Sequence, residues 1–178
     1  GVDDGANSIE ESMEMLRMEF ADGVRNIIIT PHYRKHMFET AEQEIVRQFF
    51  LVKSIAKQVS PDLRLYLGCE FHSSMDMLEL FQEREHLTLA GSSYVLTEFS
   101  NGDTEAYIKE RCYSLLSNGY QPILAHIERY ICMRKNLDLI GGLRQMGVKM
   151  QVNAESIIGK AGWGIKRFSR SLMEHGML

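Results

Sequence analysis

The feature that most constrains this chain is a repeated pattern in which a short apolar strand runs into a residue able to bind a metal or transfer a proton. Five predicted strands show it, and the last four polar residues recur at roughly the length of one βα unit. Because strand carboxyl ends converge on one mouth of a parallel barrel, these residues are expected to share a site. The strands and the residues that follow them are 24–30 with His32, 63–68 with Glu70, 93–97 with Glu98, 122–125 with His126, and 148–152 with Asn153.

Predicted helices occupy the segments between these strands. Two of them begin with capping-box patterns, and several end at a glycine. They are expected from Ser8 to Gly23, from Thr40 to just before Pro61, over residues 75–81, from Thr104 to Gly119, and around residues 137–146 and 165–175. Alternating strands and helices with short glycine-marked turns predict an α/β fold, with a parallel sheet and helices outside it.

Length and composition favour one globular domain covering residues 1–178. The chain is short for a complete (β/α)8 barrel, which takes about 250 residues. A net charge of −4 gives no electrostatic case for binding nucleic acid or an anionic membrane. No apolar run approaches the roughly 20 residues of a membrane span, and the N-terminus lacks the pattern of a signal peptide.

The three cysteines, Cys69, Cys112 and Cys132, are odd in number and scattered, with no CxxC pair. This usage favours reduced thiols and a cytoplasmic protein. None is followed six residues later by an arginine, which excludes the phosphate loop of thiol-dependent phosphatases. All three are expected to be packing residues, because buried thiols behave as small hydrophobic groups.

Three strand-end residues, His32, Glu70 and His126, predict a metal site when they are taken together. Imidazole is the commonest protein ligand for transition metals, and a carboxylate with two oxygens is able to bridge two cations. Singly, each residue has an ordinary explanation as a hydrogen-bonded histidine or a surface acid. Asp3 and Asp4 lie in a turn before the first helix, where turn formation explains them as well as metal ligation does.

Arg129 and Glu98 are the candidates for catalysis. Arg129 follows His126 by three residues, and its guanidinium offers forked donors that match phosphate oxygens. The alternative for Arg129 is an ion pair with Glu128 or another acid. Glu98 is interpreted as a ligand, a base or an acceptor that orients a ligating histidine, with a structural role as the alternative.

The order and spacing of these motifs resemble those of bacterial manganese-dependent tyrosine-protein phosphatases of the polymerase-and-histidinol-phosphatase (PHP) superfamily, which are associated with capsular and exopolysaccharide synthesis. The resemblance covers nearly the whole chain, and it departs where Ile127 replaces the family's usual proline. It rests on Gly-Val-Asp-Asp-Gly-Ala at 1–6, Thr-Pro-His at 30–32, Gly-Cys-Glu at 68–70, Leu-Thr-Glu-Phe at 96–99, Ala-His-Ile-Glu-Arg-Tyr at 125–130 and Asn-Ala-Glu-Ser at 153–156.

This resemblance implies a distorted (β/α)7 TIM-like barrel of the PHP type with a three-metal manganese site at its mouth. It implies metal ligands at His32, Glu70, His126 and Asp4, a catalytic or ligating role for Glu98, and a phosphate-binding role for Arg129. The residues leave the identity of the metal open, since Zn, Fe and Mg also suit sites of histidine and carboxylate.

The implied reaction is hydrolysis of phosphotyrosine on a protein by a metal-activated water. The implied substrate is a tyrosine kinase of the polysaccharide export machinery, and assembly into a homo-oligomer is left open. Two other functions remain as alternatives. One is a small-molecule phosphoesterase of the same superfamily, acting for example on histidinol phosphate, and the other is a non-catalytic partner-binding domain with an incomplete metal site.

Members of the family begin with an Asp-x-His-x-His strand and end with an Asp-x-His strand, and neither is present here. The segment at 1–6 matches the residues that directly follow the first motif, and Gly176 with the two residues after it would directly precede the last. The terminal strands are therefore expected to be missing from this sequence, which would leave the barrel incomplete.

Overall fold

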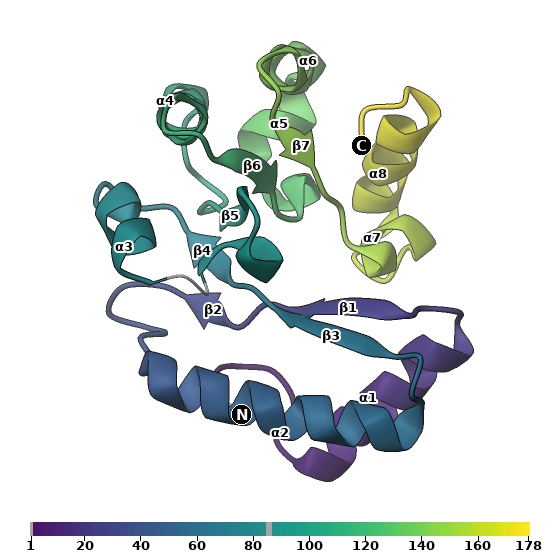
Figure 1. The fold of residues 1–178 in the computed structure, drawn as a ribbon. Coiled ribbons are helices and arrows are strands. Elements are labelled where there is room, and N and C mark those ends of the chain that lie inside the picture. The colour runs from purple at the N-terminus through teal and green to yellow at the C-terminus, as the bar shows by residue number, and fades with distance from the viewer. Residues whose placement is uncertain (1, 85–86) are drawn as a thin grey trace. The chain divides into compact units, whose positions relative to one another are not determined.

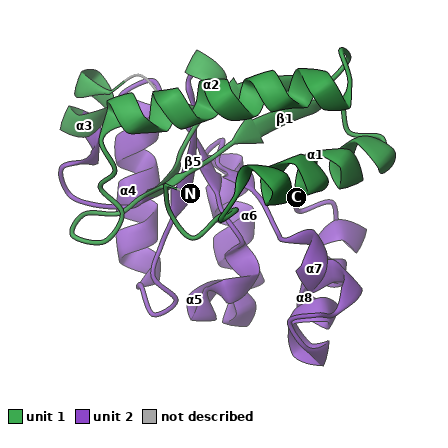
Figure 2. Cartoon of the chain, turned by 90° about the horizontal axis from the view of Figure 1, so that it is seen from below, with its two compact units in different colours: residues 1–71, 79–92 green, residues 72–78, 93–178 purple. Residues whose placement is uncertain are grey.

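The computed structural model describes residues 2–84 and 87–178, and it forms a mixed α/β fold in which the named strands pair in parallel. The chain divides into two compact units, which Figure 2 colours separately. Unit 1 comprises residues 1–71 and 79–92, and unit 2 comprises residues 72–78 and 93–178. No helix within the described ranges combines the length and the apolar character that a bilayer crossing requires.

Unit 1 pairs β1 with β3 in parallel and, after a short break in each strand, β2 with β4. Its helices α1 and α2 pack against each other on one side of β1 and β3 (Figure 1). Its elements are α1 (Ile9–Ala21), β1 (Asn26–Ile29), β2 (His32–Tyr33), α2 (Glu42–Val59), β3 (Arg64–Leu67) and η2 (Leu89–Gly91). β4 (Glu70–His72) and α3 (Met77–Glu83) contribute residues to both units.

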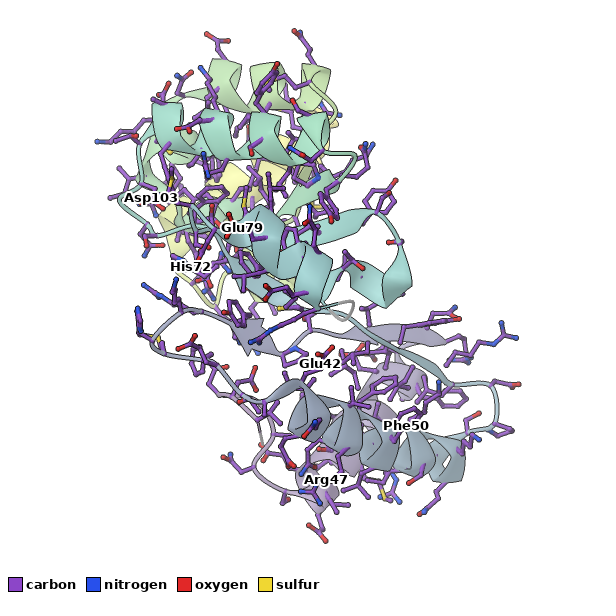
Figure 3. All side chains as sticks on the ribbon, turned by 60° about the vertical axis from the view of Figure 1, so that its left-hand side comes forward. Glu42, Arg47, Phe50, His72, Glu79 and Asp103 are labelled. Atoms are coloured by element: carbon purple, nitrogen blue, oxygen red, sulfur yellow. The ribbon has the colours of Figure 1, made fainter. Side chains whose placement is uncertain are left out.

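The core of unit 1 lies between α1, α2 and the inner face of β1 and β3. α2 is amphipathic, with Ile45, Ile55 and Ala56 buried, while Arg47 forms an exposed ion pair with Glu44. Figure 3 labels Glu42, Arg47 and Phe50 along this helix. The core cluster consists of Leu16, Ile55, Ala56, Leu63 and Leu65, with Met13, Phe20, Ile27, Ile29, Phe49, Val52 and Val59 packed against it.

Unit 2 contains the parallel strands β5, β6 and β7 with β6 in the middle. Helix α4 packs against β6, α6 packs against β7, and α8 packs against α7 and η3. The elements are β5 (Tyr94–Glu98), α4 (Glu105–Ser117), β6 (Gln121–Leu124), η3 (Ile127–Arg129), α5 (Ile131–Lys135), α6 (Leu137–Gln145), β7 (Lys149–Met150), α7 (Ala154–Ile158) and α8 (Trp163–Glu174). A buried cluster that includes Leu124, Ile127 and Tyr130 joins these strands to their helices.

All five predicted strands are present: β1, β3 and β7 are shorter than expected, and β5 and β6 have the expected length but are shifted by one residue. The six predicted helices are also present. Only one face of β1 is covered within unit 1, although it holds three consecutive isoleucines: Ile27 and Ile29 face the core, whereas Ile28 is exposed. Six short elements of the described residues were not predicted, namely β2, β4, η2, η3, α5 and α7. With two to five residues each, they are too short to carry a recognisable periodicity.

Helix caps follow the sequence pattern at two of three positions. The hydroxyls of Ser8 and Thr104 accept hydrogen bonds from the backbone N–H groups three residues on, at 3.1 Å and 3.2 Å. Thr40 was expected to open α2, but the helix begins at Glu42 with no side-chain cap. The Thr40 hydroxyl instead donates to the backbone oxygen of Val2 at 2.7 Å, so it ties down the N-terminal segment.

We predict that Gly68→Ala destabilises the protein, because Gly68 lies in the break between β3 and β4, where an added Cβ would press on the side chains of Leu89 and Ile28 and on the Leu89 backbone. A Cβ atom there would lie 2.7 Å from Leu89 Cδ2 and 3.0 Å from Ile28 Cγ2. The expected loss in the free energy of unfolding is about 1–3 kcal/mol, measured by chemical denaturation. Gly141→Ala in α6 is the matched control, since nothing lies near its Cβ and alanine favours helix by up to about 1 kcal/mol. Equal stabilities for the two variants would contradict the prediction.

Candidate functional site

His32 in unit 1 is held by the acidic turn at the start of the chain. One oxygen of Asp3, Oδ2, accepts hydrogen bonds from the His32 backbone N–H at 2.9 Å and pairs with its ring Nδ1 at 3.0 Å. The other oxygen of Asp3 accepts from the N–H of Gly5 at 3.1 Å. Asp4 Oδ1 lies 3.2 Å from the same Nδ1. The turn therefore fixes both the backbone and the ring of His32.

Glu70 lies beside His32 because β2 and β4 pair with these two residues opposite each other. His32 Nε2 is 3.8 Å from Glu70 Oε1, so the ring presents Nδ1 to Asp3 and Nε2 toward the glutamate. Adjacent strands keep Tyr33 and Phe71 stacked at 5.2 Å between ring centroids, directly after this pair. The sequence expectation that His32 and Glu70 lie together is confirmed within unit 1.

These neighbours shift the pKa values of both partners in the metal-free protein. The hydrogen bond to Asp3 raises the pKa of His32 from 6.5 to about 9, helped by the nearby charges of Glu70 and Asp4 and opposed by partial burial. The same hydrogen bond lowers the pKa of Asp3 from 3.8 to about 2. Protonated His32 and ionised Asp3 thus form a charged pair at neutral pH.

The donor set of unit 1 fits a cation. Ligand atoms of Asp3, Asp4 and His32 lie within 4.8 Å of one another. A carboxylate that holds one ring nitrogen of a histidine leaves the other nitrogen to bind a metal, an arrangement common around metal sites. The side chain of Asp4 is 68% exposed, whereas that of Asp3 is 11% exposed. The sequence analysis did not predict that Asp3 holds the ring of His32. No local pattern shows this contact, because the two residues are 29 positions apart.

In unit 2, His126 follows β6 in a left-handed backbone conformation, with φ 35° and ψ 54°. That conformation is costly for a residue other than glycine and persists where the surroundings hold it. The side-chain oxygen of Gln151 accepts from the His126 N–H, and the backbone oxygen of Gln151 accepts from the Ile127 N–H at 3.0 Å. His126 itself is buried, with its ring edge-on to Tyr130 at 5.9 Å.

Tyr130 ties the carboxyl ends of β5 and β6 together. Its buried hydroxyl donates to the backbone oxygen of Ala125 at 2.8 Å and accepts from the N–H of Phe99 at 3.0 Å. Ala125 directly precedes His126, and Phe99 directly follows Glu98. One phenol group therefore positions the backbone at two of the predicted site residues.

Arg129 is exposed, and within the described ranges it forms no ion pair. The alternative of an ion pair with Glu128 is wrong, because the Glu128 carboxylate is buried and accepts from the Asn153 N–H at 3.1 Å and the Ser156 hydroxyl at 2.7 Å. The guanidinium of Arg129 is thus available to bind an anion from solution.

Asp4, His32 and Glu70 belong to unit 1, and Glu98, His126 and Arg129 belong to unit 2. Their assignment as ligands and catalytic residues stays a prediction, as does their convergence on one mouth. The cysteines match the expectation of packing residues in two of three cases: Cys69 and Cys112 are buried, and Cys132 is partly buried. Burial raises the pKa of the Cys69 thiol, and it raises that of Cys112 to about 12.

Comparisons with known proteins identify the family of this chain and agree with its fold. The family model described as "Capsular polysaccharide synthesis, CpsB/CapC" matches residues 1–178. The chain is 40% identical over 153 residues to the tyrosine-protein phosphatase CpsB of Streptococcus pneumoniae, covering 86% of this chain and 63% of that protein. It is 31% identical over 179 residues to the tyrosine-protein phosphatase YwqE of Bacillus subtilis (strain 168), covering 99% of this chain and 70% of that protein.

One solved structure has the same fold as this chain over its full length. It comes from crystal structures of YwqE from Bacillus subtilis and CpsB from Streptococcus pneumoniae, described as unique metal-dependent tyrosine phosphatases. The match has a TM-score of 0.90 at 28% sequence identity and covers 100% of this chain and 72% of the solved chain. The protein belongs to the CpsB/CapC family of capsular polysaccharide synthesis proteins. It spans 63% of the length of the Streptococcus pneumoniae relative and 65% of the Streptococcus agalactiae relatives.

We predict that Asp3→Asn destabilises the metal-free protein in a pH-dependent way. The raised pKa of His32 means that its contribution is fully present below pH 6.5 and is lost as the pH rises through about 9. The lowered pKa of Asp3 means that its contribution is present above pH 3.8 and is lost as the pH falls through about 2. Thermal unfolding in a chelator should therefore show a larger loss in melting temperature at about pH 6 than at about pH 10.

The control is Asp62→Asn, which removes an exposed carboxylate from the same unit. Its effect on the melting temperature should be small at both pH values. An effect of Asp3→Asn that is the same at both pH values would rule out the charged Asp3–His32 pair.

Proposed function

We propose that the complete protein is a metal-dependent protein-tyrosine phosphatase that regulates capsular or exopolysaccharide synthesis. The observation that carries the proposal is Arg129: an exposed guanidinium without an acidic partner in the described part of the chain, three residues after a buried strand-end histidine. The names of the relatives supply the phosphatase class, and the metal dependence described for the solved structures agrees with the histidine and carboxylate donors.

The residues proposed to hold metal are Asp4, His32, Glu70 and His126, with Glu98 as a catalytic residue at the same site. Manganese in a three-metal cluster is the proposed cofactor, and Zn, Fe or Mg suit the same donors. Such metals, when bound, lower the pKa of a coordinated water so that it attacks phosphorus near neutral pH. Asp3 contributes by holding His32 Nδ1, which leaves Nε2 directed toward Glu70.

Arg129 is proposed to bind the phosphate oxygens of the substrate. Its forked donors match two oxygens at once, and its positive charge offsets the negative charge that develops on them in the transition state. No covalent phosphoenzyme is needed, which agrees with buried thiols whose pKa values are raised.

The remaining proposals concern the whole protein. We propose a single PHP-type domain in which further strands complete a distorted (β/α)7 barrel, because parallel strands with outer helices are the repeating unit of such barrels. The proposed substrate is a phosphotyrosine protein, namely a tyrosine kinase of the polysaccharide export system. A cytoplasmic location follows from this substrate and from the reduced cysteines, and a homo-oligomer is compatible with it.

The test of this function uses the full-length protein. Hydrolysis of a phosphotyrosine peptide is compared with hydrolysis of histidinol phosphate, before and after chelation, with metal content measured by elemental analysis. Metal-dependent cleavage that favours the peptide supports the proposal. Preference for histidinol phosphate would instead indicate a small-molecule phosphoesterase, and a protein without metal or activity would indicate a partner-binding domain.

We predict that Arg129→Ala in the full-length protein lowers kcat by roughly 10²-fold or more, because transition-state charge on the phosphate loses its stabilising partner. Steady-state kinetics on an aryl phosphate measures the effect. Metal content and melting temperature should barely change, since a guanidinium is not a metal ligand and Arg129 is exposed.

The matched control is Arg134→Ala, which removes an exposed guanidinium five residues away on α5 and should leave kcat unchanged. Near-normal turnover of the Arg129 variant would remove the proposed phosphate contact. Loss of metal or of folding would show instead that Arg129 is structural.

We predict that Cys69→Ser retains most of the activity, although Cys69 directly precedes the proposed ligand Glu70. The thiol is buried and its pKa is raised, so it is a poor nucleophile. Kinetics and metal analysis of the variant check this. A loss of several orders of magnitude in kcat with unchanged metal content would contradict the metal-dependent mechanism.

A further inference from the structure

Glu128 is a buried carboxylate that the proposed chemistry does not use. It lies in the η3 turn between His126 and Arg129, and only 1% of it is exposed. Arg129, the next residue, is exposed. The turn therefore buries one charged side chain and presents the adjacent one to solvent.

The contacts of Glu128 reach across unit 2 to the start of α7. Its Oε1 accepts from the N–H of Asn153, the N-cap residue of α7, at 3.1 Å and from the hydroxyl of Ser156 at 2.7 Å. These donors follow β7, 25 and 28 residues along the chain. One carboxylate oxygen thus connects the loop after β6 with the loop after β7.

Stability alone is a poor explanation for this carboxylate. Its second oxygen, Oε2, is buried and makes no hydrogen bond within the described ranges. A buried carboxylate without a positive partner loses its hydration and recovers only part of that loss through two neutral donors. A neutral side chain of similar size would fill the same space at lower cost. What the carboxylate does provide is a defined orientation of the turn.

The η3 turn is held by a side chain at its start and by another in its second half. At its start, the left-handed conformation of His126 is held by Gln151, which accepts from the N–H groups of both His126 and Ile127. Within the turn, the Arg129 N–H donates to the His126 oxygen at 2.9 Å, so the backbone of Arg129 moves with the turn. The side chain of Glu128 connects the second half of the η3 turn to the start of α7.

We propose that Glu128 is a positioning residue: by binding Asn153 and Ser156 it orients the η3 turn so that Arg129 is held toward the substrate phosphate. The inference rests on the proposed phosphatase function and assigns Glu128 no contact with substrate or metal. It acts through Arg129, and it is distinct from Gln151, which acts on the backbone at His126.

The test compares Glu128→Ala and Glu128→Gln in the full-length, metal-loaded protein. For each we measure kcat and KM on p-nitrophenyl phosphate, the inhibition constant of inorganic phosphate, metal content and melting temperature. Glu128→Ala should lower kcat and weaken phosphate inhibition by about 10-fold or more, since misplacing a catalytic group by about 1 Å is costly. Glu128→Gln keeps an oxygen for both donors and should restore most of this loss. Metal content should be unchanged.

The double variant Glu128→Ala/Arg129→Ala tests whether the effect passes through Arg129. If it does, removing Glu128 has little further effect on kcat once Arg129 is absent. Ser156→Ala, which removes one of the two hydrogen bonds, should shift the same constants in the same direction by less. It keeps the inference testable if Glu128→Ala does not fold. Glu155→Gln, an exposed acid on α7 paired with Lys160, is the matched control and should change nothing.

Three outcomes would overturn the positioning role. The first is a lowered melting temperature with unchanged kinetic and phosphate-binding constants, which describes a purely structural residue. The second is loss of metal, which would connect Glu128 to His126 instead. The third is a further loss of kcat in the double variant, relative to Arg129→Ala, that is as large as the loss caused by Glu128→Ala alone. A wild-type protein without metal-dependent activity would refute the phosphatase function itself, so the two failures are distinguishable.

Discussion

Parallel pairing of short strands is the constraint on which the candidate site residues depend. In unit 1, the register of β2 and β4 sets His32 opposite Glu70. In unit 2, Thr97 of β5 pairs with Leu124 of β6, so the next residues of both strands emerge at the same edge. Since parallel strands end together, residues far apart in the sequence meet at strand ends without any local signal linking them. The remaining interactions refine the directions in which those residues point.

Buried polar contacts provide this refinement, and each makes use of a group that would be costly to leave unpaired. Tyr130 joins the segments that follow β5 and β6 through one hydroxyl, and Gln151 holds the left-handed turn at His126. In unit 1, Asp3 holds both the backbone and the ring of His32 through one carboxylate oxygen. Glu128 differs because one of its oxygens is satisfied twice and the other makes no hydrogen bond in the described part of the chain. This imbalance is why its role is assigned to orientation and not to stability.

Sequence patterns were sufficient for most elements whose signal is local. Apolar runs predicted the five strands, and the serine and threonine before α1 and α4 act as caps. The pattern failed at Thr40, whose hydroxyl contacts Val2, because a capping motif does not reveal which distant backbone group competes for the hydroxyl. It also missed β2 and β4, which are too short for a periodic signal and which pair with each other.

The sequence by itself determined the α/β alternation, the family, and the spacing of His126 and Arg129 on one turn, since these depend on periodicity and on neighbours within a few residues. The tertiary structure alone decided the partners of the charged side chains. Asp3 binds His32 across 29 residues, and Glu128 turns away from Arg129 to groups 25 and 28 residues further on. The sequence alone does not predict the hydrogen-bond partner of a carboxylate, because that partner depends on which segments packing brings within hydrogen-bonding distance.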